Sequence, residues 1–324
     1  MRANLYDIIE GNDILQLNVN KTDALVEGMI YPNDYILLVA EEKVGKTIFA
    51  QQLASNMTTG KSFLGIFDIP KPLKVWYFAT EGKAEDLKDR FIRMNKSINM
   101  NTSNVVLIPT FFRFNTQEGV KALQELLIRF ETNTPDIIIV DALYRAIKGS
   151  IKNDDVVNDF HHIMGWLMKQ CDCAIVLIHH MTKPQRSQQD GSMFQRSDKD
   201  TFGSAFLSAA VDHIFWLEKW GKDKDHKNDR ILKCDTQRSG NILNNIRIRL
   251  IEPDPLYFEV VSKHEAEKHR VRQLLQSYNG LDINELQRKS RVSRTALYIV
   301  LKELQNEGAV IKSGGKVKIY SIKK

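Results

Sequence analysis

The segment from Ala40 to Thr47 has the residue types and the spacing of a phosphate-binding loop. It reads Ala-Glu-Glu-Lys-Val-Gly-Lys-Thr, it follows an apolar run typical of a strand, and it precedes a stretch, 48–56, with helical character. Backbone N–H groups of such a loop and of the next helix's first turn can bind phosphate oxygens. Lys46 can neutralise the β and γ oxygens, and the Thr47 hydroxyl can bind Mg2+.

The loop therefore predicts a site for ATP and Mg2+. The residues that we expect to contact the nucleotide are Glu42, Lys43, Val44, Gly45, Lys46, Thr47 and Ile48. The pattern departs from its usual form at Ala40, where a glycine is common, so the backbone there must have an angle that a Cβ atom tolerates. The alternative is a Gly-Lys-Thr that occurs by chance in a surface turn.

Two carboxylates follow apolar runs that are typical of buried strands. Asp141 ends the run 137–141, where a carboxylate can reach the magnesium shell, so Thr47 and Asp141 are the predicted metal ligands. Glu81 follows the run 75–79, and in open α/β sheets this end of a strand carries the chemistry, so Glu81 can orient the attacking water. The alternatives are a turn-forming aspartate and an acidic residue at a helix N-terminus.

Two histidines, His179 and His180, end another apolar run, 174–179. A polar side chain there can hydrogen-bond the γ-phosphate and transmit its loss to the following loop. Histidines that only complete the hydrogen bonding at a strand end are the alternative. The sequence predicts no zinc site, because no Cys, Asp or Glu lies at short ligand spacing around them.

Short apolar runs alternate with amphipathic stretches over the first two thirds of the chain, which predicts an α/β fold with a parallel sheet covered by helices. The central strands are expected at 35–40, 75–79, 105–109, 137–141 and 174–179, with helices that include 120–130 and 156–168. Further strands are expected at 211–217, 231–236, 246–251 and 257–261, with charged turns at 222–230 and 252–255. These strands would extend the sheet.

The last 60 or so residues have the pattern of a winged helix-turn-helix. Apolar residues recur at helical spacing, Asp282 and Glu285 have capping-box spacing, and Ser293 can cap the third helix, which should end at Gly308. The runs 309–313 and 316–322 flank two glycines, which predicts a hairpin. We expect a boundary near Ser262, between residues 1–262 and 263–324.

Charge and cysteine content bear on the partners and the compartment. Of the charged residues, 13 Lys and Arg against 6 Asp and Glu lie between residues 264 and 324, which leaves 33 against 34 in the rest. This asymmetry favours a polyanionic partner for the tail, and a solvated basic face is the alternative. Three cysteines form no disulfide framework, and no apolar run is long enough to cross a bilayer, so we expect a cytoplasmic protein.

These motifs, in this order, resemble the RecA-like family of RepA-type plasmid and phage replicative helicases, which are relatives of DnaB. The matching segments are Ala-Glu-Glu-Lys-Val-Gly-Lys-Thr, Trp-Tyr-Phe-Ala-Thr-Glu-Gly from Trp76, Thr-Pro-Asp-Ile-Ile-Ile-Val-Asp from Thr134, Leu-Ile-His-His-Met-Thr-Lys from Leu177 and Gly-Ser-Ala-Phe-Leu-Ser-Ala-Ala-Val-Asp from Gly203. The resemblance implies a homo-oligomeric ring, usually a hexamer, with ATP at subunit interfaces. It also implies that Glu81 is the catalytic carboxylate and that a strand-end histidine senses the γ-phosphate.

The same resemblance assigns two further segments. Residues 233–241 resemble the strand that brings an arginine finger to the neighbouring subunit's ATP, with Arg238 as the candidate, although Thr236 stands where relatives often have a lysine. The loop 181–201 would face the ring's channel and contact single-stranded DNA through Arg186, Arg196 and Lys199. The alternatives are an ordinary strand-end arginine and a disordered surface loop.

The winged helix is similar to many DNA-binding modules. Its candidate phosphate contacts are Arg291, Arg294, Lys302, Lys312, Lys316 and Lys318. Winged helices also serve as protein docking modules, which is the alternative. Together these features predict a ring-forming, ATP-driven DNA helicase that replicates a plasmid, virus or mobile element, acts on single-stranded DNA and has duplex origin DNA as a further partner. An ATP-switched DNA-binding regulator and a recombinase-type ATPase are the other hypotheses.

Overall fold

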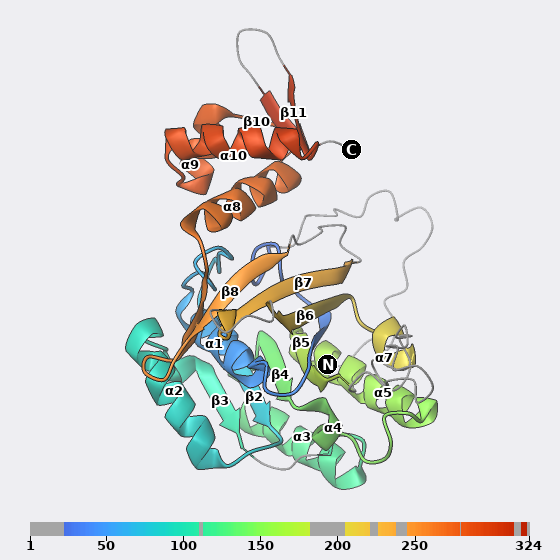
Figure 1. Ribbon diagram of the computed structural model, residues 1–324. Helices are drawn as coiled ribbons and strands as arrows, with labels where there is room; N and C mark the ends of the chain where they lie inside the picture. The colour runs from blue at the N-terminus through green and yellow to red at the C-terminus, as the bar shows by residue number, and fades with distance from the viewer. Residues whose placement is uncertain are drawn as a thin grey trace, which may run out of the picture.

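The structure is a computed structural model that describes residues 23–109, 113–181, 205–220, 226–237, 245–278, 280–313 and 319–322. None of its described helices is both long and apolar enough to cross a membrane. A large α/β part and a smaller tail are visible, with the tail drawn in orange to red (Figure 1).

A nine-stranded sheet forms the centre of the larger part (Figure 1). Its strands, in spatial order, are β3 (Val105–Ile108), β2 (Val75–Ala79), β4 (Ile137–Asp141), β5 (Ala174–His180), β1 (Tyr35–Ala40), β6 (His213–Lys219), β7 (Asp229–Gln237), β8 (Ile246–Ile251) and β9 (Tyr257–Val260). Neighbours from β3 to β6 are parallel, and those from β6 to β9 are antiparallel. The predicted α/β class, the five central strands and the sheet extension are confirmed.

Helices cover both faces of the parallel strands, which explains why these strands are continuous apolar runs. Alternate residues of β1 enter two separate cores, with Ile36 and Leu38 in one and Leu37 and Val39 in the other. The helices are α1 (Lys46–Thr59), α2 (Ala84–Ile98), α3 (Gln117–Arg129), α4 (Leu143–Ala146), α5 (Asp154–Cys171) and α7 (Ala205–Ala209). Residues of α1 and α2 belong to the first core, and residues of α3 and α5 belong to the second.

The start of β7 corrects one sequence prediction. Asp229 and Arg230 were expected in a charged turn, but they begin the strand and are buried. The strand can include them because Arg247 and Arg249 on β8 form ion pairs with Asp229, so its charge is compensated inside the sheet. Local charge density predicts a turn, and only the pairing of β7 with β8 reverses that prediction.

Strand β9 ends the sheet and is tied to α1 by a buried amide. The Gln52 side chain donates Nε2–H to the Phe258 carbonyl at 2.8 Å and accepts the Phe258 N–H at 2.5 Å. The two hydrogen bonds satisfy backbone groups that an edge strand would leave unpaired. The Phe258 ring packs against Phe49, with ring centroids 6.1 Å apart, so α1 is anchored directly behind the phosphate loop.

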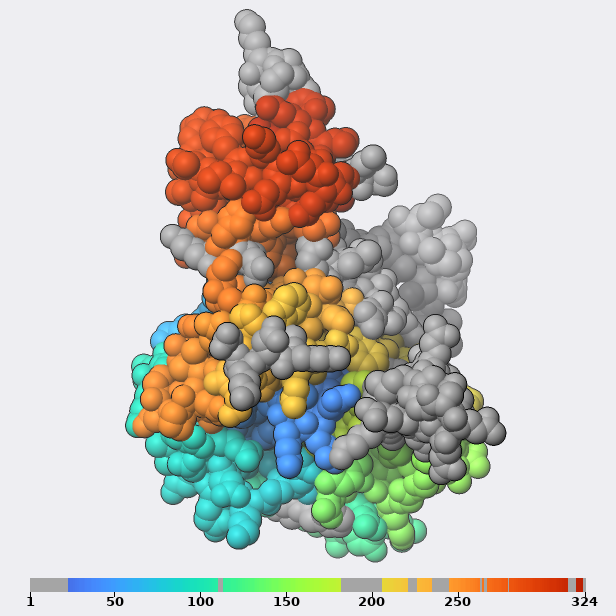
Figure 2. All heavy atoms as spheres, viewed as in Figure 1, coloured from blue at the N-terminus to red at the C-terminus, as the bar shows by residue number. Residues whose placement is uncertain are grey.

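The tail has its own core and the element order helix, strand, helix, helix, strand, strand. Its elements are α8 (Lys263–Ser277), β10 (Leu281–Asp282), α9 (Ile283–Ser290), α10 (Arg294–Asn306), β11 (Val310–Ser313) and β12 (Ile319–Ile322). The strands form a three-stranded sheet in the order β10-β12-β11, and Leu286, Leu297 and Leu301 are among its buried core residues. Figure 2 shows the tail, in orange and red, as a lobe that projects from the larger part. The domain boundary near Ser262 stays a prediction.

Side-chain contacts hold α8 on the larger part. Arg270 donates to the Gly65 carbonyl, Gln273 donates to the Glu27 carbonyl at 3.2 Å, and the His269 ring lies 5.1 Å from that of Phe67. Each contact comes from α8, so this helix joins the core of the tail to the larger part.

The predicted caps of the tail helices are present. Asp282 accepts the N–H groups of Asn284 and Glu285, while Glu285 accepts the Asp282 N–H at 3.1 Å, which completes a capping box. Ser293 accepts the Ala296 N–H at the start of α10. Strand β10 was not predicted, because two residues carry no periodic signal.

The capping box gives a testable expectation for local stability. Asp282→Ala removes the acceptor for two orphan N–H groups, so the free energy of opening α9 should fall by about 1 kcal/mol. Amide hydrogen exchange of α9, followed by mass spectrometry, should then be roughly fivefold faster. Asp282→Asn is the matched control, because asparagine caps equally well, and equal exchange in both variants would contradict the assignment.

Candidate functional site

The phosphate loop lies between the carboxyl end of β1 and the first turn of α1. Gly45 has φ +107°, a conformation that favours glycine, and a Cβ atom on it would come within 3.0 Å of the Phe258 ring. Ala40, by contrast, is the last residue of β1 and pairs with β5 in an extended conformation. The departure from glycine at Ala40 is therefore tolerated, because the strand continues through this position.

Lys46 carries a buried amino group at this edge of the sheet. Only 4% of its surface is exposed, and its Nζ donates to the carbonyls of Ala40 and Glu41, both at 2.7 Å. Burial lowers the pKa of Lys46 to about 8, while the charge of Asp141 and then that of Glu81 oppose this shift. Lys46 is thus cationic at neutral pH and can exchange two carbonyl partners for phosphate oxygens.

Asp141 lies opposite the loop at the end of β4. Its carboxylate accepts the Tyr77 hydroxyl at 2.7 Å and the Thr47 hydroxyl at 3.4 Å. Burial raises the pKa of Asp141, and these two hydrogen bonds oppose the rise. A buried carboxylate next to a hydroxyl is a set of hard oxygen donors that fits Mg2+, and the cation would stabilise the ionised form. The structure places Thr47 and Asp141 side by side, and their role as metal ligands stays a prediction.

The described residues contain no cluster of three or more His, Cys, Asp and Glu side chains that could hold a metal without help. A magnesium ion at Thr47 and Asp141 would therefore need phosphate oxygens and water for its remaining ligands, which is how Mg2+ is commonly bound. This agrees with a cation that arrives together with a nucleotide.

Glu81 lies beyond the end of β2 and shares its two oxygens between two donors. Its Oε2 accepts the Tyr144 hydroxyl at 2.6 Å, and its Oε1 lies 3.3 Å from His180 Nε2. The hydrogen bond with His180 is the main cause of a lowered pKa for Glu81, and the bond from Tyr144 adds to it. Glu81 is therefore an anionic acceptor at neutral pH.

The two histidines of β5 differ in surroundings. His180 is partly exposed and reaches Glu81, whereas His179 is buried, and burial lowers the pKa of His179 to about 4. His180 lies on the same face of β5 as Ile178, the face that α1 covers. Of the two predicted candidates, His180 contacts the predicted catalytic carboxylate, Glu81.

A cavity of about 270 Å³ joins these groups. It is lined by Thr47, Ala79, Glu81, Gly82, Lys83, Asp86, Leu87, Arg90, Asp141 and Arg145. The predicted metal ligands and the predicted catalytic carboxylate therefore face one space. Arg90 and Arg145, which the sequence did not single out, add positive charge to it.

A second cavity, of about 330 Å³, lies on the other side of the phosphate loop, against β7 and β8. Its lining residues are Lys43, Val44, Gly45, Ile48, Lys219, Lys227, Asn228, Arg230, Leu250 and Glu252. Four of the residues expected to contact nucleotide therefore border this space.

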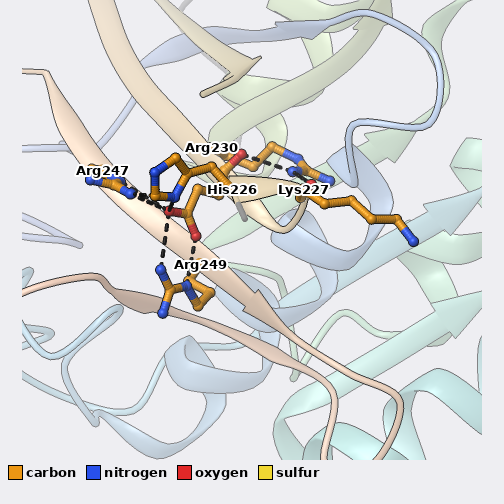
Figure 3. A network of polar contacts seen from close by, with 6 residues as sticks. His226, Lys227, Arg230, Arg247 and Arg249 are labelled. Carbon is orange, nitrogen blue, oxygen red and sulfur yellow. Dashed lines mark hydrogen bonds and ion pairs between the residues drawn. The ribbon is translucent and has the colours of Figure 1, made fainter. Parts of the chain in front are cut away.

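Arg230 on β7 contacts this side of the loop, and Figure 3 shows it beside Lys227. Its Nε donates to the Val44 carbonyl at 2.7 Å, and its Nη1 donates to the carbonyls of Lys227 and Asp229 at 2.8 Å. Sequence reasoning missed Arg230, because a contact across 186 residues leaves no local pattern.

Asp229 anchors the strand that carries Arg230 through ion pairs with Arg247 and Arg249. Its carboxylate is 1% exposed and accepts hydrogen bonds from Arg247 and Arg249, with the shortest N–O distances at 2.5 and 2.6 Å. These two arginines hold the pKa of Asp229 at about 2, and Arg249 has the larger effect. The ionised network fixes the start of β7 beside the phosphate loop.

The remaining predicted residues belong to other parts of the chain. Arg186, Arg196, Lys199, Arg238, Lys316 and Lys318 lie outside the described residues. Arg291, Arg294, Lys302 and Lys312 are exposed on the tail. None of these four lines either cavity beside the phosphate loop.

The strand order, the phosphate loop and the adjacent side chains of Thr47 and Asp141 define a phosphate-loop ATPase fold. Residues 12–186 match the family model described as AAA domain, so the chain belongs to the AAA domain family. No curated protein matches. The solved structures to which the chain is similar include the following two. A RadB recombinase has 17% identity and a TM-score of 0.47, over 71% of this chain and 92% of that one. The KaiC-like protein PH0186 from Pyrococcus horikoshii OT3 has 13% identity and a TM-score of 0.49, over 74% and 94%.

The lowered pKa of Asp229 leads to a pH-dependent prediction. Its folded pKa of about 2 is below the ordinary 3.8, so its contribution to stability is complete above about pH 4 and is lost as the pH falls through 2. Asp229→Asn should lower the free energy of unfolding by about 2 kcal/mol at pH 7 and by roughly half of that at pH 3.

Urea unfolding at both pH values measures the effect of Asp229→Asn. Asp254→Asn is the control, because Asp254 pairs with Lys96 at an exposed position and should contribute under about 1 kcal/mol. A loss for Asp229→Asn that is the same at pH 7 and pH 3 would show that its charge does not stabilise β7.

Proposed function

We propose that this protein hydrolyses ATP with Mg2+ at the phosphate loop and couples the hydrolysis to work on DNA. The observation that carries the ATPase proposal is that Thr47, Asp141 and Glu81 line one cavity, with Lys46 in electrostatic contact with both carboxylates. A cation, a hydroxyl and two carboxylates around one space are what a magnesium-bound triphosphate requires.

Each residue has a distinct part in the proposed reaction. Loop N–H groups and Lys46 bind the β and γ phosphate oxygens, and Thr47 and Asp141 hold Mg2+, which when bound neutralises the charge that develops on these oxygens. Glu81 orients a water molecule in line with the γ phosphorus. The water oxygen bonds to phosphorus as the bond to the bridging oxygen of ADP breaks, which yields ADP, phosphate and one released proton.

The proposed work on DNA is that of a ring-forming replicative helicase. The motif order from Ala40 to Asp212 supports it through the resemblance to RepA-type helicases. In that proposal Arg238 acts on a neighbouring subunit's ATP, and Arg186, Arg196 and Lys199 contact single-stranded DNA. The ring, usually hexameric, would place each ATP between two subunits.

The tail favours a second candidate. Its element order and three-stranded sheet support a winged helix, and α10 exposes Arg294, Tyr298, Ile299 and Lys302, a mixture of basic and apolar groups that suits duplex DNA. In this candidate the tail binds a duplex, and the core is a recombinase-like ATPase or an ATP-dependent switch without unwinding activity.

Solution assays separate the two candidates. A helicase should hydrolyse ATP faster with single-stranded DNA, should unwind a forked duplex, and should form closed rings in electron micrographs. The second candidate instead predicts tight duplex binding with ATP turnover but no unwinding, and a recombinase-like form would assemble into open filaments. Absence of any DNA effect on turnover would contradict the helicase candidate, and absence of duplex binding at low salt would contradict the second candidate.

The ATPase proposal itself is tested at Lys46. Lys46→Ala removes the buried cation that faces the phosphates, so ATP turnover should fall at least about 100-fold, with weaker nucleotide binding. Lys71→Ala, at an exposed position, is the control and should retain full turnover. Steady-state phosphate release and titration with a fluorescent ATP analogue measure the two effects. Unchanged affinity and turnover in Lys46→Ala would rule out the site.

A further inference from the structure

Tyr144 is placed to control the orientation of Glu81. It lies on α4, three residues after Asp141, so the strand that supplies a magnesium ligand also fixes the helix that carries Tyr144. Its hydroxyl donates to Glu81 Oε2 at 2.6 Å, a shorter distance than the 3.3 Å between Glu81 Oε1 and His180 Nε2. A short bond from a neutral donor to a carboxylate is strong and directional.

The Tyr144 ring is itself held from two directions. Its edge meets the His180 ring, with centroids 5.5 Å apart and planes at 75°, and the Arg145 guanidinium lies 5.3 Å from its centroid. Burial and the bond to Glu81 both raise the pKa of Tyr144, so the hydroxyl stays protonated and remains a donor. Tyr144 is 42% exposed, so its orientation depends on these contacts and not on burial.

The two carboxylate oxygens of Glu81 are therefore held by hydrogen bonds of different length. Oε2 accepts a 2.6 Å hydrogen bond from the Tyr144 hydroxyl, whereas Oε1 has a longer, 3.3 Å contact with His180. A histidine that turns to a γ-phosphate would release Oε1 and leave Oε2 where it is. Oε1 is then the oxygen that can accept a hydrogen bond from the attacking water.

We propose that Tyr144 is a positioning residue for Glu81, whose hydroxyl holds Oε2 so that Oε1 faces the water that attacks ATP. This inference rests on the proposed ATPase function. Tyr144 does not touch the substrate in this assignment. It acts through the orientation of Glu81, because catalysis depends on placing the water and the carboxylate in line with the γ phosphorus.

Tyr144→Phe tests the proposal, because it removes the hydroxyl and keeps the ring between His180 and Arg145. We expect kcat for ATP hydrolysis to fall about tenfold while KM stays within about twofold, since ground-state binding does not use this hydroxyl. Tyr278→Phe is the matched control. Tyr278 is also 42% exposed and also has a cation over its ring, from Lys289 at 4.0 Å, but it lies on the tail.

A double-mutant cycle shows whether the effect passes through Glu81. In single-turnover measurements, Tyr144→Phe should slow hydrolysis about tenfold in the native background and less than about twofold in a Glu81→Gln background. An equal loss in both backgrounds, an unchanged kcat, or a rise in KM without a fall in kcat would overturn the proposal. If Lys46→Ala and Glu81→Gln also left turnover unchanged, the ATPase function itself would be wrong, so the two failures can be told apart.

Discussion

The structure depends on burying the charge of Lys46 at the carboxyl edge of a parallel sheet. Removing an ammonium group from water is costly, and here that cost is offset by two loop carbonyls and by the field of Asp141 and Glu81. These partners can be close only if β1, β4 and β2 are parallel and adjacent to the same helix layer. The strand order provides this, because β4 lies between β2 and β5, and β5 pairs with β1.

The positions of the strands could be predicted because parallel strands buried on both faces are apolar throughout. Strands β1, β2 and β4 have the predicted bounds, and β3 and β5 differ by one residue. The phosphate loop was equally visible, since its chemistry depends on residues that are adjacent in the chain. Charge patterns were less reliable, as Asp229 shows, because an ion pair with a neighbouring strand reverses the preference of a charged residue for a turn.

The contacts that orient the site residues were beyond sequence reasoning. Tyr144 and Glu81 are 63 residues apart, and Arg230 and Val44 are 186 apart. A local sequence pattern, which spans at most about 20 residues, cannot contain both partners. Neither Tyr144 nor Arg230 belongs to a motif that a spacing rule could find. Residue types with an obvious role in phosphate chemistry were predicted, whereas the residues that hold them in place were found only from their contacts.

The phosphate loop is contacted from two sides, by Asp141 through Thr47 and by Arg230 through Val44. On one side Thr47 reaches Asp141, and the 3.4 Å distance leaves room for a cation to replace the hydrogen bond. On the other side Arg230 holds Val44 through a 2.7 Å bond, and Asp229, whose pKa its arginine partners hold at about 2, fixes that strand. In the proposed function the Thr47–Asp141 contact would change when nucleotide and Mg2+ bind, while the Arg230–Val44 contact would stay the same. Because β7 starts at this second contact, its first residues have a fixed position beside the phosphate loop.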